Sequence, residues 1–140
     1  MIATQSIPEI EQEIISEFDS LDDPMMKYEY IIELGKALSP LPEEYRTPTN
    51  IVKGCQSNVW LHSEVGDGTV TFMADSDAFI TKGLIALLVR VLSGQGAEEI
   101  VNARLDFIDA IKLRSHLTEG RSNGLTAMIG RMKREAMRLS

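Results

Sequence analysis

One side chain in this sequence of 140 residues stands out as a nucleophile: Cys55, the only cysteine. It lies in the segment VKGCQSNVW, directly after Gly54, which lets the backbone bend or approach a partner closely. The segment follows a stretch rich in proline and threonine and precedes a predicted strand, so we expect the thiol in a loop, where functional side chains concentrate. A lone thiol cannot form an intramolecular disulfide, nor by itself hold a zinc ion or an iron–sulfur cluster.

Two kinds of chemistry are open to a single loop thiol. A cysteine-dependent hydrolase requires a histidine base beside the thiol, and the sequence offers two histidines, His62 and His116. A covalent carrier instead accepts a group, holds it and releases it, which requires access, shielding and a docking surface but no resident base. A buried cysteine can also be simply a small apolar side chain. The residue pattern alone leaves these three interpretations open.

Three other charged residues are candidates for the same site. Asp75 and Asp77 precede an apolar segment with helical spacing, where aspartate caps a helix and stabilises its positive end. Arg121 is suited to capping, to pairing with an aspartate or to solvation, and its spacing does not choose among these roles.

The charge distribution limits the classes of partner. The net charge is −7, and residues 1–45 carry 11 acidic and 2 basic side chains, against 10 acidic and 12 basic in the remainder. An acidic chain lacks the basic face that neutralises phosphates, so we do not expect nucleic-acid binding. The acidic segment is typical of solvated helix faces, and it is also suited to selecting a protein partner.

Nothing in the sequence indicates export or membrane insertion. The first residues, MIATQSIPEIEQEI, lack the basic and apolar regions of a signal peptide. The longest apolar run, LIALLVRVL, is too short to cross a bilayer and contains Arg90. We therefore expect a cytoplasmic protein that does not bind membranes.

Hydrophobic periodicity predicts one α+β domain over residues 1–140. Two helices are followed by a hairpin and further helices that pack on one side of its sheet. The predicted elements are a helix over 7–19, a helix over 24–38 capped by Asp23, strands over 56–65 and 69–74 joined by a turn at 66–68, a helix from the DSD segment to about 93, short helical or irregular pieces, and a last helix beginning near Thr118 or Ser122.

Three segments resemble the SufE family of sulfur-acceptor proteins. They are YEYIIELGKALSPLPEEYRTPTNIVKGCQSNVWL, DSDAFITKGL and SHLTEGRSNGLTAMI, and the similarity covers nearly the whole chain. The resemblance implies that Cys55 receives persulfide sulfur from a SufS-type cysteine desulfurase, stimulates that enzyme and passes the sulfur to iron–sulfur scaffold proteins. It implies a carrier rather than an enzyme, without a cofactor of its own, since the pyridoxal phosphate belongs to the desulfurase.

The resemblance also implies a fold and a set of site residues. The fold is a two-layer α+β sandwich shared with scaffolds of the IscU type, which use three cysteines where this chain has one. Asp75 and Arg121 match family positions near the cysteine loop and the partner surface. Gly120 replaces a serine or threonine that is commoner in the family. A second thiol nearby would attack the persulfide and release its sulfur, so a single cysteine suits the carrier.

We further predict that the thiol is shielded at rest and that Gly54 acts as a hinge between Pro48 and the following strand. The predicted shield consists of apolar residues that flank the loop and of one from the return strand: Val52, Val59, Trp60, Leu61 and Phe72. A shielded persulfide escapes exchange with other thiols.

Overall fold

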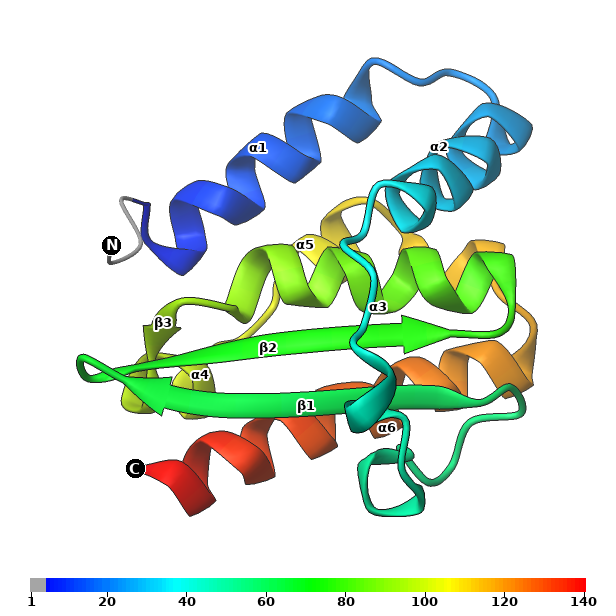
Figure 1. Cartoon of the computed structure of the whole chain (residues 1–140). Helices are drawn as coiled ribbons and strands as arrows, with labels where there is room; N and C mark the ends of the chain where they lie inside the picture. Colours follow the sequence, from blue (N-terminus) through cyan, green and yellow to red (C-terminus); the bar gives the residue numbers. More distant parts are fainter. Residues whose placement is uncertain (1–4) are drawn as a thin grey trace.

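A small antiparallel sheet with helices stacked on one side makes up the fold, as a computed structural model of residues 5–140 shows (Figure 1). The strands are β1 (Val59–Gly66), β2 (Thr69–Ser76) and β3 (Gln95–Gly96), in the order β1-β2-β3. The helices are α1 (Ile7–Asp19), α2 (Pro24–Lys36), α3 (Phe79–Leu92), α4 (Ala97–Asn102), α5 (Phe107–Ala110) and α6 (Glu119–Leu139), and the 3-10 turns are η1 (Glu43–Tyr45), η2 (Pro48–Asn50) and η3 (Leu113–His116). The predicted α+β architecture is confirmed.

Local signals explain where α1 begins. Ser6 accepts a hydrogen bond from the Glu9 N–H at 3.3 Å, and the Glu9 carboxylate accepts one from the Ser6 N–H at 2.9 Å. This reciprocal cap satisfies two donors that a helix start leaves free. The apolar stripe of α1, predicted from its spacing, is buried: Ile7, Ile10, Ile14 and Phe18.

The start of α2 was also predicted correctly. The Asp23 carboxylate accepts from the Met25 N–H at 2.9 Å, and Pro24 occupies the first helical position. The helix ends at Lys36, two residues before the predicted end, because the proline-rich segment that follows cannot continue a helix. We call this segment, residues 39–50, the strap.

The hairpin differs from its prediction at the strand ends. Asp67 and Gly68 form the turn with positive φ angles of 54° and 77°, the combination that suits the twist of a two-residue hairpin. The first strand begins at Val59 rather than at residue 56, because the cysteine segment forms a loop of its own. The second strand continues to Ser76, which pairs with Val59. The two-residue strand β3 was not predicted, since so short a pairing has no periodicity.

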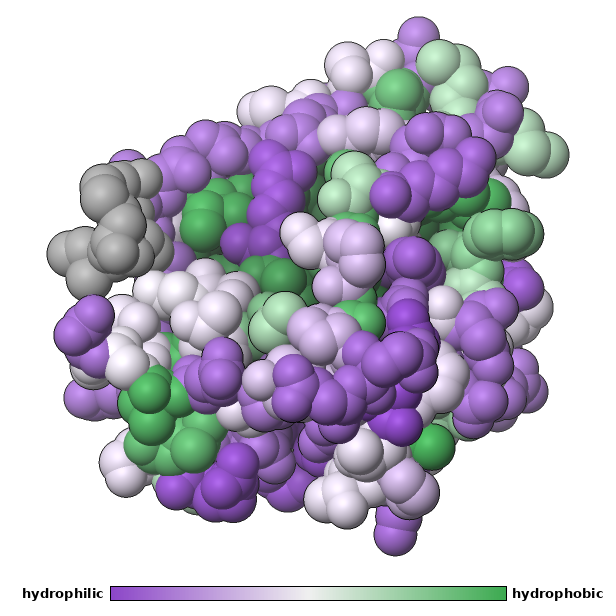
Figure 2. All heavy atoms as spheres, viewed as in Figure 1, coloured by the Kyte–Doolittle hydropathy of each residue, from purple (hydrophilic) through white to green (hydrophobic). Residues whose placement is uncertain are grey.

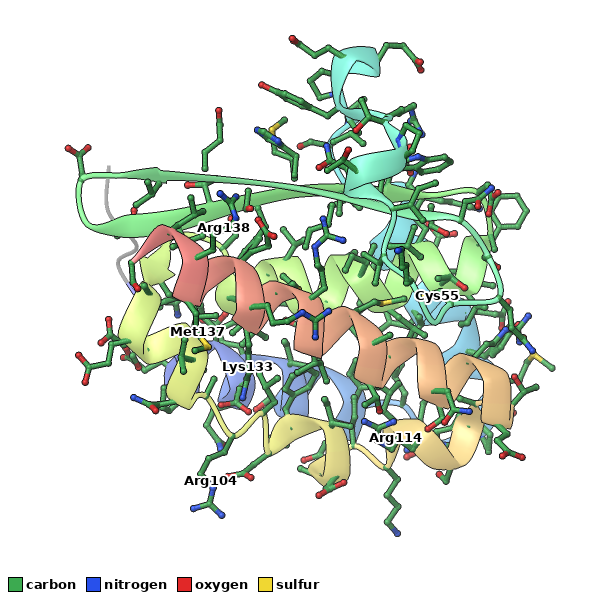
Figure 3. All side chains as sticks on the ribbon, turned by 90° about the horizontal axis from the view of Figure 1, so that it is seen from below. Cys55, Arg104, Arg114, Lys133, Met137 and Arg138 are labelled. Atoms are coloured by element: carbon green, nitrogen blue, oxygen red, sulfur yellow. The ribbon has the colours of Figure 1, made fainter. Side chains whose placement is uncertain are left out.

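The central helix α3 lies between the sheet and α2. Its side chains Leu84, Ile85 and Leu88 are fully buried, as expected for a helix that is apolar on most sides. At the crossing with α2, a Cβ on Gly83 would lie 2.1 Å from the Ile31 carbonyl oxygen, so the two backbones are in direct contact. Figures 1 and 3 show α3 and α6 side by side under one face of the sheet.

The last helix, α6, begins after Thr118, whose hydroxyl accepts from the Arg121 N–H at 3.3 Å. Of the two candidate caps, Thr118 is therefore the one used. The buried stripe of α6 consists of Leu125, Met128, Met132 and Ala136. Lys133 donates to the Ala103 carbonyl at 2.6 Å, which fastens α6 to the connection after α4 (Figure 3).

Polar residues cover most of the face seen in Figure 2, including the outer side of α1, and the apolar patches between them are small. Across residues 5–140, none of the helices combines the length and the apolar composition needed to cross a membrane.

Candidate functional site

The loop that carries the cysteine, residues 53–57, is pinned at both ends. The Val52 N–H donates to the Val59 carbonyl at 2.8 Å, which closes the loop at its base. At the other end the Asp77 carboxylate accepts from the backbone N–H and the side-chain amide of Asn58, at 3.1 and 2.9 Å. The Ser76 hydroxyl donates to the Asn58 carbonyl at 2.8 Å. The residues between these anchors, 53–57, form the tip of the loop.

The Asp77 contact corrects the prediction that Asp75 and Asp77 cap α3. The position before that helix belongs to Ala78, and within the described part of the chain no side chain caps the helix start there. Pairing in the hairpin extends through Asp75, so this residue lies in β2. Long-range partners occupy both carboxylates, and the local capping signal was therefore misleading.

Cys55 lies against α6, with its sulfur 3.6 Å from the Gly124 carbonyl oxygen (Figure 3). The side chain is half-buried, and burial raises the pKa of the Cys55 thiol. A Cβ on Gly124 would lie 3.5 Å from the sulfur, in ordinary van der Waals contact, so the loop packs directly on this part of α6. At rest the group is a protonated thiol that donates weakly to a carbonyl, with little of the reactive thiolate.

Neighbouring loop residues contact the same face of α6. Gly54 adopts a φ of +99°, and a Cβ built on it would lie 3.1 Å from the Ala127 Cβ. The Gln56 side chain covers Gly120, where a Cβ would lie 2.3 Å from the carboxamide. Gly120, Gly124 and Ala127 are spaced four and three residues apart and so share one side of the helix. We call this row the α6 seat; it accommodates the loop in antiparallel order.

The α6 seat adds a cover over the thiol that the sequence did not predict, beside the apolar core against which Cys55 packs. Val52, Val59, Leu61 and Phe72 are almost completely buried in the core. The Trp60 ring is stacked instead with the guanidinium of Arg46, 5.0 Å from the ring centroid. One side of the thiol is thus covered by a helix residue 69 positions away in sequence. The small residues at 120, 124 and 127 are the only trace of it in the sequence.

Asp75 is the centre of an ion-pair cluster. Its carboxylate accepts from the Arg46 guanidinium and from the Ser76 N–H at 2.8 Å, and it lies 3.2 Å from the Lys82 ammonium. Burial opposes ionisation, but Arg46, the Ser76 N–H and Lys82 together hold the pKa of Asp75 below its ordinary value. The cluster ties the strap before the loop to β2 and α3. Arg46 is 29 residues from Asp75 in the sequence, so no local pattern indicates this pairing.

We expect Asp75→Asn to lower the free energy of unfolding by about 2 kcal/mol at pH 7, since the amide loses charge-assisted bonds to Arg46 and Lys82. A carboxyl with a depressed folded-state pKa stabilises the fold above its unfolded-state value near 3.8, and this contribution is lost as the pH falls through the folded-state pKa. The difference between variant and wild type should therefore shrink below about pH 4. Urea unfolding at several pH values measures it, and a difference that is constant with pH would contradict the assignment.

Arg121 links the start of α6 to α2. Its guanidinium donates to the Tyr28 hydroxyl at 3.3 Å, while its N–H completes the Thr118 cap. Among the described residues, the hydrogen bonds of Asp75 and Arg121 all go to groups other than Cys55. Gly54 and Cys55 both contact α6. Asp75 instead binds Arg46 of the segment before the loop, and Arg121 joins the start of α6 to α2.

The two histidines lie in other surroundings. The His62 ring stacks on Tyr45 with centroids 3.6 Å apart, on the strand face that also carries Trp60. His116 lines a cleft of about 290 Å³ together with Pro24, Met25 and Tyr28. Within residues 5–140 neither imidazole is hydrogen-bonded to the thiol, so no nucleophile–base pair forms there. The same part of the chain contains no group of three side chains suited to a metal ion.

Comparison with known proteins places this arrangement in a family. The profile of the SufE domain, described as an Fe-S metabolism associated domain, matches residues 12–136. The chain is 44% identical over 129 residues to an uncharacterized SufE-like protein of Rhizobium meliloti, covering 89% of this chain and 92% of that protein. It is 39% identical over 136 residues to the SufE-like protein 1, chloroplastic/mitochondrial, of Arabidopsis thaliana, covering 96% of this chain but 37% of that longer protein.

A solved structure supports the same fold. The solution structure of a hypothetical protein from Thermus thermophilus superimposes with a TM-score of 0.77, covering 93% of this chain and 95% of that one, at 21% identity. The domain profile matches most of the chain, and the Rhizobium meliloti relative is 44% identical over 92% of its own length. Together these matches establish the family that the cysteine motif suggested. The chain belongs to the SufE family.

Proposed function

We propose that the protein is a cytoplasmic sulfur carrier that takes persulfide sulfur onto Cys55 from a SufS-type cysteine desulfurase and delivers it to iron–sulfur scaffold proteins. It also stimulates the desulfurase and needs no cofactor of its own. The observation that carries the proposal is the lone thiol, held protonated on the α6 seat in a loop whose two ends are pinned. Family membership supplies the link to Fe–S metabolism.

The transfer step is a thiol exchange without net oxidation. The Cys55 thiolate attacks the outer sulfur of the desulfurase persulfide, so that a new S–S bond forms at Cys55. The S–S bond within the desulfurase breaks, its cysteine leaves as a thiolate, and that thiolate takes up the proton lost from Cys55. One thiol and one persulfide enter, and one of each leaves.

The resting geometry requires the loop to open for this step. Burial raises the thiol pKa and the Gly124 backbone covers one side of the sulfur, so the closed loop disfavours attack. We propose that docking of the desulfurase selects an open state in which the tip swings away from the α6 seat about Gly54. The anchors at Val52 and Asn58 would then limit movement to the residues between them.

Mass spectrometry of the intact protein tests the proposal. Incubation with a SufS-type desulfurase and free cysteine should increase the mass by one sulfur atom, and a reductant should reverse the gain. Peptide mapping should place the added sulfur on Cys55. Without the desulfurase the mass should stay constant. A full turnover of the desulfurase with no added sulfur on this protein would refute the carrier role.

The alternative interpretation, a cysteine-dependent hydrolase, gains no support from the positions of the histidines. His62 is engaged with Tyr45, and His116 lines the cleft beside Met25. We therefore propose no hydrolytic function.

A further inference from the structure

The face of α6 that holds the cysteine loop continues beyond Ala127 to Arg131. This guanidinium donates to the Ile51 carbonyl at 3.1 Å and to the Thr49 carbonyl at 2.9 Å. Its side chain is only 17% exposed. Both acceptors are backbone carbonyl groups of the segment that leads into the loop. Arg131 therefore binds the backbone of this segment and not its side chains.

A second set of contacts braces Arg131 itself. The Glu135 carboxylate lies 3.4 Å from the Arg131 Nε and accepts a hydrogen bond from the Ser63 hydroxyl at 2.6 Å. Ser63 belongs to β1, which begins directly after the loop. Glu135 of α6, itself fixed by Ser63 of β1, thus holds one side of the guanidinium. This ion pair limits the number of rotamers that Arg131 can adopt.

The acceptors of Arg131 determine how the loop is seated. Ile51 forms an isolated bridge with Trp60, and the next residue, Val52, closes the loop base. The hydrogen bonds from Arg131 therefore hold this entry segment, residues 49–52, on α6 directly before the loop begins. Contacts along the α6 seat then hold Gly54, Cys55 and Gln56 in order. Without Arg131, the entry segment could lift together with the tip.

We propose that Arg131 is a positioning residue that keeps the cysteine loop on the α6 seat and confines its opening to residues 53–57. The proposal concerns the same site as the proposed carrier function and builds on it. Its first consequence, protection of the thiol in the free protein, requires no sulfur chemistry. Its second consequence is that the loop presents Cys55 to a desulfurase in a single position relative to α6.

The test compares Arg131→Met, which keeps the apolar stem and removes the donors, with Arg134→Met, an exposed neighbour on the same helix. We expect iodoacetamide to alkylate Cys55 about tenfold faster in folded Arg131→Met, because two charge-assisted hydrogen bonds to the entry segment are lost. Arg134→Met should react at the wild-type rate. In sulfur transfer, Arg131→Met should need a higher desulfurase concentration for half-maximal rate while the maximal rate is kept.

Arg131→Lys retains the charge and can reach one carbonyl, so its Cys55 should be alkylated at an intermediate rate. If Arg131→Met fails to fold, the rate in Arg131→Lys tests the positioning role instead. A wild-type alkylation rate in a folded Arg131 variant would overturn the positioning role and leave sulfur acceptance standing. If the wild-type protein gains no sulfur but Arg131→Met still exposes the thiol, the carrier function fails and the positioning role survives.

Discussion

Cys55→Ser should abolish sulfur acceptance and reduce desulfurase activity to the level measured without this protein. A serine hydroxyl is not ionised near neutral pH and is a poor nucleophile toward persulfide sulfur, so no S–S bond can form at position 55. The fold should persist, because the side chain is only half-buried and the hydroxyl can still donate to the Gly124 carbonyl. Intact mass after incubation with desulfurase and cysteine, sulfide release and circular dichroism measure the three quantities.

His62→Gln is the matched control for this experiment. His62 lies on β1, close in sequence to the loop, but its ring stacks on Tyr45 and, among the described residues, has no hydrogen bond to the thiol. A carrier should therefore keep its full mass gain in His62→Gln, whereas a hydrolase using this histidine would lose activity. Full stimulation of the desulfurase by Cys55→Ser would refute the carrier role.

Alkylation of Cys55 in the free folded protein should be about ten- to a thousandfold slower than in the urea-unfolded chain, corresponding to an open state populated at roughly 10 to 0.1%. Two features of the closed state act in the same direction. The α6 backbone at Gly124 covers the sulfur, and burial raises the thiol pKa, which depletes the thiolate that reacts. Mass spectrometry of samples quenched over time gives both rates at one pH.

An exposed thiol in the same loop provides the control. Lys53→Cys in the Cys55→Ser background puts a thiol two residues away at an exposed position. This thiol should be alkylated at nearly the rate of the unfolded chain. The slow reaction of Cys55 would then be due to its burial on the α6 seat and not to its place in the loop. Addition of a desulfurase whose own cysteine has been replaced should accelerate the reaction of Cys55. Equal rates for Cys55 in the folded and unfolded protein would refute the shielded resting state.

Short-range patterns were sufficient for much of the fold. The bounds of α1 and the start of α2 were predicted because capping residues and apolar spacing act within one or two turns of helix. The hairpin turn at Asp67 and Gly68 was predicted because few residues tolerate positive φ. The strand ends were less accurate, since they depend on which residues find a partner across the sheet.

The sequence by itself determined the chemistry of this protein: one thiol, in a loop after a glycine, without a second cysteine to pair with. Only the tertiary structure decided what surrounds that thiol. The Gly124 carbonyl, the Arg46 partner of Asp75 and the Arg131 contacts to the entry segment all join residues far apart in the chain. Periodicity and capping describe interactions between near neighbours, whereas these contacts exist because packing of α6 and the strap against the sheet brings distant backbone and charged groups within bonding distance.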